Sequence, residues 1–321
     1  MIFFDLGDER MAKVCIVGCG AMGSVYAGLM AAAGHEVHAV TPWQTHVDAI
    51  NARGLRVSGY SGDRVVRLAG ASTTTDKIGP CDLVVIATKA FDVEAAARSI
   101  TPLLGADTVV QTIQNGVGSP EIVARHVDPA RLAVGVVGGY GASILEDGHA
   151  HHNGLAVTWF GAYKGLSRSN LEASAEVWRS SGFEVSLHDD VASMVWKKVI
   201  MNVAYSGTSG LTELTIGQII DHPHAWQIAA ECSREAVAVA RAQNIDLGLS
   251  DPIAHVRALG GKIPNARPSM LLDLQAGRRC EVDAINGAVA RLGREHGVPT
   301  PVNDVVVALI RAKESARVPQ S

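Results

Sequence analysis

Short apolar runs alternate with helical stretches along the first part of the chain, from residue 12 to about residue 189. The runs are apolar throughout, which is typical of strands that are covered on both faces. This alternation predicts an α/β domain with a parallel, doubly wound sheet. The predicted strands are Lys13–Val17, Glu36–Val40, Leu83–Ala87, Thr108–Ile113 and Leu132–Val137, and the helices between them are Gln44–Arg53, Val93–Leu104 and Ser119–His126.

Two pairs of shorter runs interrupt this order. Leu55–Ser58 and Arg64–Leu68 are predicted to form an inserted hairpin. Ala150–Asn153 and Leu155–Phe160 are predicted to form another, because Asn153-Gly154 between them is a strong turn signal. Phe183–Leu187 is expected to be the last strand. Histidines at 149, 151 and 152 lie beside the second hairpin, where an exposed surface is a better interpretation than a metal site.

The pattern changes to helices from Asp190 onward, and prolines separate them. An all-helical second domain over residues 190–317 is therefore expected, after a first domain over 12–189, with residues 1–11 as a disordered leader. A cofactor cleft is expected between the domains. The predicted helices are Val191–Ser206, Ala225–Gln243, Met270–Gln275 and Asp283–His296, and their predicted core is Leu272, Leu274, Val282, Ile285, Val289 and Leu292.

The first strand leads directly into a glycine motif, Gly18-Cys19-Gly20-Ala21-Met22-Gly23, which opens a helix of small residues. Gly18 permits a tight turn, Gly20 leaves room for a pyrophosphate, and Gly23 lets the helix pack close to the strand. Free N–H groups at the helix N-terminus attract the anion. We therefore expect a dinucleotide to bind through Gly18, Gly20, Ala21, Met22 and Gly23.

The residues after the second strand, Val40-Thr41-Pro42-Trp43-Gln44-Thr45-His46, hold neither the acid typical of NAD sites nor the Arg typical of NADP sites. No carboxylate there would repel a 2′-phosphate, and the Thr41 hydroxyl could bind one. This favours NADP (NADPH) as the cofactor.

Composition excludes several classes of function. The chain has 321 residues, 47% of them hydrophobic and 19% charged, with a net charge of −4, so neither nucleic acid nor a membrane surface is expected as a partner. Its five cysteines form no C-x-x-C pair, and no apolar segment is long enough to span a bilayer. A cytoplasmic protein with a small-molecule substrate is predicted, and the long apolar helices favour a homodimer.

Polar residues suited to hydride-transfer chemistry stand at four places. Lys89 and Asn115 follow predicted strand ends. Lys198, Asn202 and Ser206 are spaced i, i+4, i+8 and share one helix face, although a solvated face with a snorkelling lysine would look the same. Ser269 and Glu281 flank a later helix; Ser269 could equally be a helix cap.

Together these segments resemble the ketopantoate reductase family (2-dehydropantoate 2-reductases), through GCGAMG, TKAFD, QNGVG, WKKVIMN, PSMLLD and EVDAINGAV. The resemblance implies a Rossmann domain followed by a helical domain, with NADPH as cofactor. It implies Lys198 as the catalytic lysine, Glu281 as the acid that contacts substrate or cofactor, and Asn202 and Ser269 as substrate-binding residues. Lys89 and Asn115 correspond to residues near the nicotinamide ribose and the substrate, and Ala142 to a backbone contact with the cofactor.

Ser206 departs from the family pattern, because a second Asn is usual at this position. The leading hypothesis is reduction of 2-dehydropantoate to pantoate by NADPH, with Lys198 as general acid and with Asn115, Asn202, Ser206 and Ser269 binding substrate. The alternatives are a reductase of another ketone or an imine, a non-catalytic dinucleotide sensor, and a relative of the 3-hydroxyacid dehydrogenases.

Overall fold

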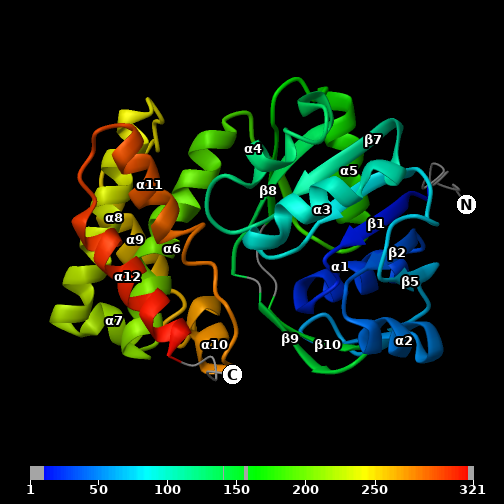
Figure 1. Cartoon of the computed structure of the whole chain (residues 1–321), viewed down its shortest axis with the longest axis horizontal. Coiled ribbons are helices and arrows are strands. Elements are labelled where there is room, and N and C mark those ends of the chain that lie inside the picture. The colour runs from blue at the N-terminus through cyan, green and yellow to red at the C-terminus, as the bar shows by residue number, and fades with distance from the viewer. Residues whose placement is uncertain (1–10, 140, 155–157, 317–321) are drawn as a thin grey trace, which may run out of the picture. The chain divides into compact units, whose positions relative to one another are not determined.

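The computed structural model describes residues 11–139, 141–154 and 158–316 and divides the chain into two compact units (Figure 1). The first contains the residues up to Gln114 together with Pro120–Asp189. The second contains Asn115–Ser119 together with the residues from Asp190 onward. The proposed leader lies outside the described residues except for Met11.

The first unit is built on an eight-stranded sheet with the order β12-β11-β8-β7-β6-β1-β2-β5. Neighbouring strands run parallel, except that β11 runs antiparallel to β8. The strands are β1 (Lys13–Val17), β2 (Glu36–Val40), β5 (Gly70–Ser72), β6 (Cys81–Ile86), β7 (Leu104–Thr112), β8 (Leu132–Val137), β11 (Thr158–Ala162) and β12 (Val185–Leu187). The predicted doubly wound α/β sheet is confirmed.

The chain leaves β1 toward β2 and later returns to its other side with β6, so the order reverses between β1 and β6. Parallel sheets bind ligands outside the carboxyl ends of the strands at such a point. The glycine turn follows β1 directly and therefore lies there.

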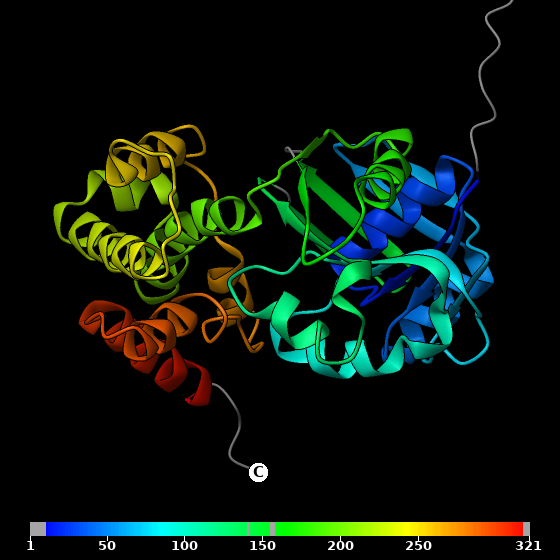
Figure 2. The same ribbon diagram turned by 90° about the horizontal axis from the view of Figure 1, so that it is seen from above.

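Helices cover both faces of this sheet (Figure 2). On one face, Tyr26 and Trp178 pack edge to face at 4.9 Å between ring centroids, beside Phe160 and Phe183. The other face is covered by apolar residues such as Val93 and Val123. The helices are α1 (Ala21–Ala32), α2 (Gln44–Arg53), η1 (Ala90–Asp92), α3 (Val93–Ser99), η2 (Thr101–Leu103), α4 (Ser119–Val123), η3 (Pro129–Arg131) and α5 (Arg168–Ser180).

A second sheet of four strands, in the order β4-β3-β10-β9, packs against α1. It contains β3 (Leu55–Gly59), β4 (Arg64–Val66), β9 (Gly141–Glu146) and β10 (His149–Gly154). The predicted hairpin of β3 with β4 is confirmed by their antiparallel pairing.

The hairpin predicted around Asn153-Gly154 is wrong. Both residues lie within β10, and β11 belongs to the other sheet, while residues 155–157 lie outside the described part of the chain. The turn is instead Asp147-Gly148, where Gly148 has φ of 77°, and it joins β10 to the unpredicted strand β9. Asp-Gly supplies the left-handed conformation of a tight turn as readily as Asn-Gly, so local sequence did not distinguish them.

The expectation of an exposed histidine cluster is also wrong. His149 and His152 are buried, with 8% and 0% of their surface exposed, because β10 is an inner strand of the four-stranded sheet. No group of three His, Cys, Asp or Glu side chains in the described part of the chain could hold a metal ion.

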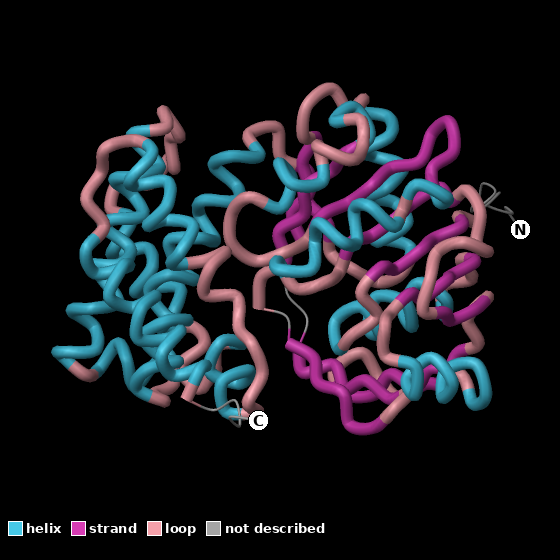
Figure 3. The backbone as a smooth tube through the Cα atoms, viewed as in Figure 1, coloured by secondary structure: helices cyan, strands magenta, loops and turns pink. Residues whose placement is uncertain are grey.

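The described residues of the second unit form helices and loops without strands (Figure 3). Its core contains the predicted Leu274, Val282, Ile285, Val289 and Leu292, but Leu272 is 42% exposed. Leu271 and Leu274 are buried on the same side of their helix, and Leu272 lies on another side. The helices are α6 (Val191–Thr212), α7 (Ile216–Asp221), α8 (Pro223–Ala242), α9 (Pro252–Gly261), α10 (Ser269–Gln275), α11 (Asn286–Glu295) and α12 (Pro301–Ser315).

Helix α6 continues six residues beyond the predicted end at Ser206. The added turns contain Gly207 and Gly210, both buried. A Cβ at Gly207 would lie 2.4 Å from Val306 of α12, and one at Gly210 would lie 2.9 Å from Ile310. The small residues therefore let α12 approach α6 closely.

Among the described residues, no helix has the length and apolarity that crossing a membrane requires.

Candidate active site

The glycine turn has the geometry that a dinucleotide loop needs. Gly18 has φ of 101°, and a Cβ there would lie 2.4 Å from the backbone N of Thr88. A Cβ on Gly23 would lie 2.3 Å from the carbonyl oxygen of Gly18. At Gly20, by contrast, a Cβ would meet nothing within 4 Å. Two glycines are thus required by the protein itself, whereas the third leaves open space at the N-terminus of α1.

Backbone hydrogen bonds hold this turn against β2. The N–H groups of Gly18 and Cys19 both donate to the Val40 carbonyl, at 2.8 and 3.0 Å. The N-terminus of α1 follows at Ala21 and Met22, which are half-buried. Helix N-terminal N–H groups lack partners within the helix, so this end of α1 can accept an anion.

The segment after β2 lies beside the turn and contains no Lys or Arg from Thr41 to His46. Thr41 is buried, and its hydroxyl accepts the Trp43 N–H at 3.5 Å. Gln44 donates to Asp48 at 2.7 Å. Hydrogen-bond donors are therefore present here without a compensating cation.

Lys89 and Ala142 complete the predicted cofactor residues in the first unit. Lys89 follows β6 and is the N-cap residue of η1, half-buried. Behind it, Gln114 donates to the carbonyls of Ile86 and Thr88 at 2.6 and 3.2 Å, which fixes the end of β7 to the end of β6. Ala142 lies on β9 and pairs with His152.

In the second unit, α6 carries Lys198, Asn202 and Ser206. Lys198 and Asn202 are half-buried and Ser206 is 6% exposed, whereas Val199, Ile200 and Val203 belong to the core as expected. Burial lowers the pKa of Lys198 to about 8, although the Glu281 carboxylate raises it. Lys198 is therefore a lysine that can both hold and release a proton near neutral pH.

Glu281 meets two of the other predicted residues within the second unit. Its side chain is 6% exposed, interacts electrostatically with Lys198, and accepts a long hydrogen bond from Asn115 Nδ2 at 3.4 Å. The 115–119 segment is held there because Val117 N–H donates to the Ala284 carbonyl at 3.0 Å. A Cβ at Gly116 would lie 1.9 Å from that same carbonyl oxygen, so only glycine fits.

Ser269 is the predicted substrate residue with the least support from its surroundings. It is exposed and is the first residue of α10, while Pro268 occupies the N-cap position without a side-chain hydrogen bond. Capping by Ser269 is therefore wrong, and its hydroxyl remains accessible to a ligand.

Two buried residues were missed by sequence reasoning. Asn286 is fully buried and donates to the Val203 carbonyl of α6 (3.1 Å) and to Asn303 Oδ1 (2.9 Å), so it anchors α6. His46 is fully buried on α2. Its spacing of four residues from Ile50 on the buried face of α2 was the available signal.

Comparison with known proteins agrees with this architecture. The family model described as ketopantoate reductase PanE/ApbA matches residues 14–165, and that of the ketopantoate reductase PanE/ApbA C terminal matches residues 190–314. A 2-dehydropantoate 2-reductase from Archaeoglobus fulgidus is 31% identical over 306 residues, covering 95% of this chain and 99% of that relative.

Solved structures are also similar to this chain over most of its length. A PanE/ApbA family ketopantoate reductase from Ralstonia eutropha has a TM-score of 0.86 at 31% identity, covering 95% of this chain and 99% of that one. D-mandelate dehydrogenase with NADH and anilino(oxo)acetate has a TM-score of 0.87 at 26% identity, with 95% and 99% covered. With its glycine turn, its helical second unit and these relatives, the chain belongs to the ketopantoate reductase family, whose members are oxidoreductases that use pyridine nucleotides.

Proposed function

We propose that this protein reduces the carbonyl of a 2-oxo acid with NADPH, and that 2-dehydropantoate, which would become pantoate, is its preferred substrate. The observation that carries the proposal is that half-buried Lys198 interacts electrostatically with buried Glu281 and has a pKa of about 8. An acid of this strength is matched to proton donation near neutral pH.

The residues of the first unit fit a dinucleotide. Open space over Gly20 would take the pyrophosphate, while the N–H groups of Ala21 and Met22 at the start of α1 would bind its oxygens. Lys89 and Thr41 would bind ribose or phosphate oxygens, and the backbone at Ala142 would add a further contact. When bound, the dinucleotide supplies a hydride to the carbonyl carbon of the substrate.

Residues of the second unit would handle the charge that develops on the carbonyl oxygen. The Lys198 ammonium stabilises that oxyanion and then donates a proton from Nζ to give the alcohol. Glu281 keeps Lys198 charged against the cost of burial. The side chains of Asn115, Asn202, Ser206 and Ser269 would donate hydrogen bonds to the substrate carboxylate and hydroxyl groups.

The test is to follow oxidation of reduced nicotinamide with 2-dehydropantoate and with a panel of 2-oxo acids, ketones and imines. Turnover of 2-dehydropantoate with NADPH is the expected result. If the dinucleotide binds but none of these compounds is reduced, the enzyme hypothesis is wrong and a sensor role takes its place.

NADH is the second candidate for the cofactor. The segment after β2 has no cation for a 2′-phosphate, and structural neighbours were determined with NADH. Comparing kcat/KM for NADPH and NADH decides which of the two cofactors the protein prefers. Preference for NADH would contradict the first choice.

An aromatic or otherwise bulky 2-oxo acid is the second candidate for the substrate. Ser206 has a shorter side chain than the Asn usual in the family, and a structural neighbour is a D-mandelate dehydrogenase with anilino(oxo)acetate bound. Higher kcat/KM for phenylglyoxylate than for 2-dehydropantoate would favour this alternative. A homodimer and a cytoplasmic location remain predictions.

A further inference from the structure

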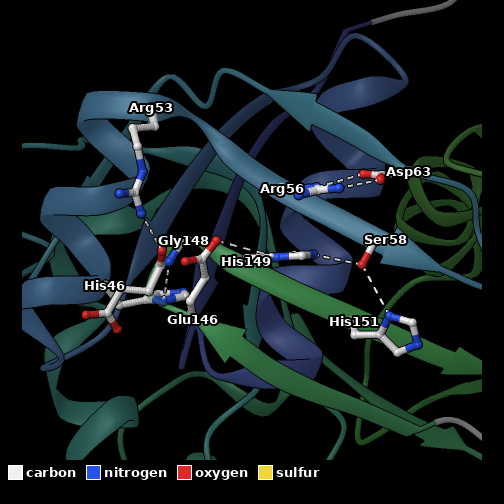
Figure 4. A network of polar contacts seen from close by, with 10 residues as sticks. His46, Arg53, Arg56, Ser58, Asp63, Glu146, Gly148, His149 and His151 are labelled. Carbon is white, nitrogen blue, oxygen red and sulfur yellow. Dashed lines mark hydrogen bonds and ion pairs between the residues drawn. The ribbon is translucent and has the colours of Figure 1, made fainter.

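His46 lies where three segments meet, namely α1, the turn between β9 and β10, and the segment after β2. It is fully buried in the first turn of α2, and its imidazole contacts α1, the turn between β9 and β10, and the ring of Trp43. Figure 4 shows His46 facing Gly148 at the β9–β10 turn.

The hydrogen bonds determine the tautomer of this imidazole. The Gly148 backbone N–H can only donate, and it lies 3.1 Å from His46 Nδ1, so Nδ1 must be the unprotonated acceptor. In the neutral ring, Nε2 then carries the proton and donates to Ser24 Oγ at 3.1 Å. Ser24 is fully buried on α1, one residue after Gly23.

The chain of contacts continues into the glycine turn itself. Ser24 Oγ lies 3.4 Å from the thiol sulfur of Cys19, which stands between Gly18 and Gly20. Burial raises the pKa of Cys19 to about 11, so this thiol stays protonated and inert. Together, Cys19, Ser24 and His46 form a buried polar support behind the turn.

The same imidazole supports the segment after β2. The indole of Trp43 stacks on His46 with 4.8 Å between ring centroids and 23° between planes. Trp43 is 41% exposed, and its Nε1–H donates to Thr45 Oγ1 at 2.9 Å. In doubly wound folds the adenosine half of a dinucleotide lies at the end of the second strand, which is where Trp43 stands.

We propose that neutral His46 is a positioning residue of the dinucleotide half-site: it fixes the glycine turn, Trp43 and the β9–β10 turn in one arrangement without touching the ligand. The inference rests on the proposed function, because it assumes that the turn binds a dinucleotide. Preorganised groups lose less entropy on binding, so a loosened support would weaken affinity rather than change the chemical step.

Protonation of His46 would disrupt this arrangement. An imidazolium carries N–H at both nitrogens, so Nδ1–H would face the Gly148 N–H, donor against donor. Burial lowers the pKa of His46, and the Asp147 carboxylate from the β9–β10 turn raises it less. Two further titratable groups belong to the same network: Arg53 on the same helix, which donates to the Asp147 carbonyl at 2.8 Å, and the neutral Cys19, which contacts Ser24.

The experiment measures binding of NADP⁺ and NAD⁺, which survive at acid pH, to the full chain by calorimetry from about pH 5 to about pH 8. NAD⁺ serves as comparator because it lacks the 2′-phosphate that itself titrates. The variants are His46→Leu, which removes both hydrogen bonds, and His46→Asn, which keeps a neutral acceptor near the position of Nδ1. His38→Gln is the matched control, since His38 lies on β2 and its imidazole bonds to the exposed Glu36.

For His46→Leu at about pH 7.5 we expect Kd to rise about tenfold, with kcat at saturating cofactor changed less than about twofold. Affinity of the unsubstituted protein should fall toward the acid end of this pH range, as His46 becomes protonated. His46→Asn should bind with a Kd within about threefold of that of the unsubstituted protein at neutral pH and should not lose affinity in acid. His38→Gln should match the unsubstituted protein throughout.

Equal Kd for His46→Leu and the unsubstituted protein would overturn the proposal. So would identical pH dependence of binding in His46→Asn and the unsubstituted protein, and this comparison holds even if His46→Leu does not fold. Failure of the unsubstituted protein to bind either dinucleotide would overturn the proposed function together with this inference, whereas normal binding with insensitive His46 variants would overturn this inference alone.

Discussion

The Glu281 carboxylate and the burial of Lys198 act in opposite directions on the same ammonium group. Burial lowers the pKa of Lys198, Glu281 raises it, and the result is a pKa of about 8 instead of 10.5. The pair therefore sets the pH at which Lys198 changes from a proton donor to a proton acceptor.

The rate of carbonyl reduction should fall as pH rises through about 8. Lys198 is protonated below its pKa and neutral above it, so the proposed general acid is lost on the alkaline side. A pH profile of kcat measures this. Lys198→Met should lower kcat by about a thousandfold, whereas Lys197→Met, one position earlier on α6, should retain most of it. A full rate in Lys198→Met would show that another group donates the proton.

Glu281→Gln should move the alkaline loss of rate to lower pH. Without the carboxylate, the influence that raises the pKa of Lys198 is lost, so this pKa falls below about 8. At neutral pH, kcat should drop by about tenfold or more. Asp283→Asn is the control, because Asp283 pairs with Arg311 at the surface (2.6 Å). An unshifted profile in Glu281→Gln would mean that Glu281 does not control the charge of Lys198.

Alanine substitutions at two glycines of the turn should have different effects. In Gly23→Ala the new Cβ lies 2.3 Å from the Gly18 carbonyl oxygen, so we expect a loss of about 2 kcal/mol in the free energy of unfolding. In Gly20→Ala the methyl group meets no protein atom within 4 Å, so stability should hold while dinucleotide affinity falls. Urea unfolding and cofactor titration measure the two effects, and the reverse assignment would refute the geometry.

Ser206→Asn should shift substrate preference toward 2-dehydropantoate. Ser206 is 6% exposed on α6, one turn beyond Asn202, and the substitution restores the amide usual in the family. We expect the ratio of kcat/KM for 2-dehydropantoate over phenylglyoxylate to rise about tenfold, which is the value of one substrate hydrogen bond. Thr212→Asn, further along α6, is the control. No change in the ratio would exclude Ser206 as a determinant of specificity.

Much of the candidate site could be predicted from the sequence, because the signals for it lie within single strands and helices. The glycine spacing, the apolar runs and the i, i+4, i+8 spacing of Lys198, Asn202 and Ser206 depend on neighbours along one strand or helix. The position of one turn was predicted wrongly because two sequence signals for a turn were equally good. Asp147-Gly148 and Asn153-Gly154 are both good turns, and only the pairing of β9 with β10 selected the first.

By itself, the sequence determined the doubly wound sheet, the glycine turn after β1, and the helix face that carries Lys198. Only the tertiary structure decided which groups meet: Asn115 and Glu281 are 166 positions apart, and the pKa of Lys198 depends on Glu281, which lies on another segment. The tertiary structure also buries His46 and places its imidazole within hydrogen-bond distance of Ser24 and Gly148. The physical reason is that burial and Coulomb interactions depend on distances in space, which the order of residues along the chain does not contain.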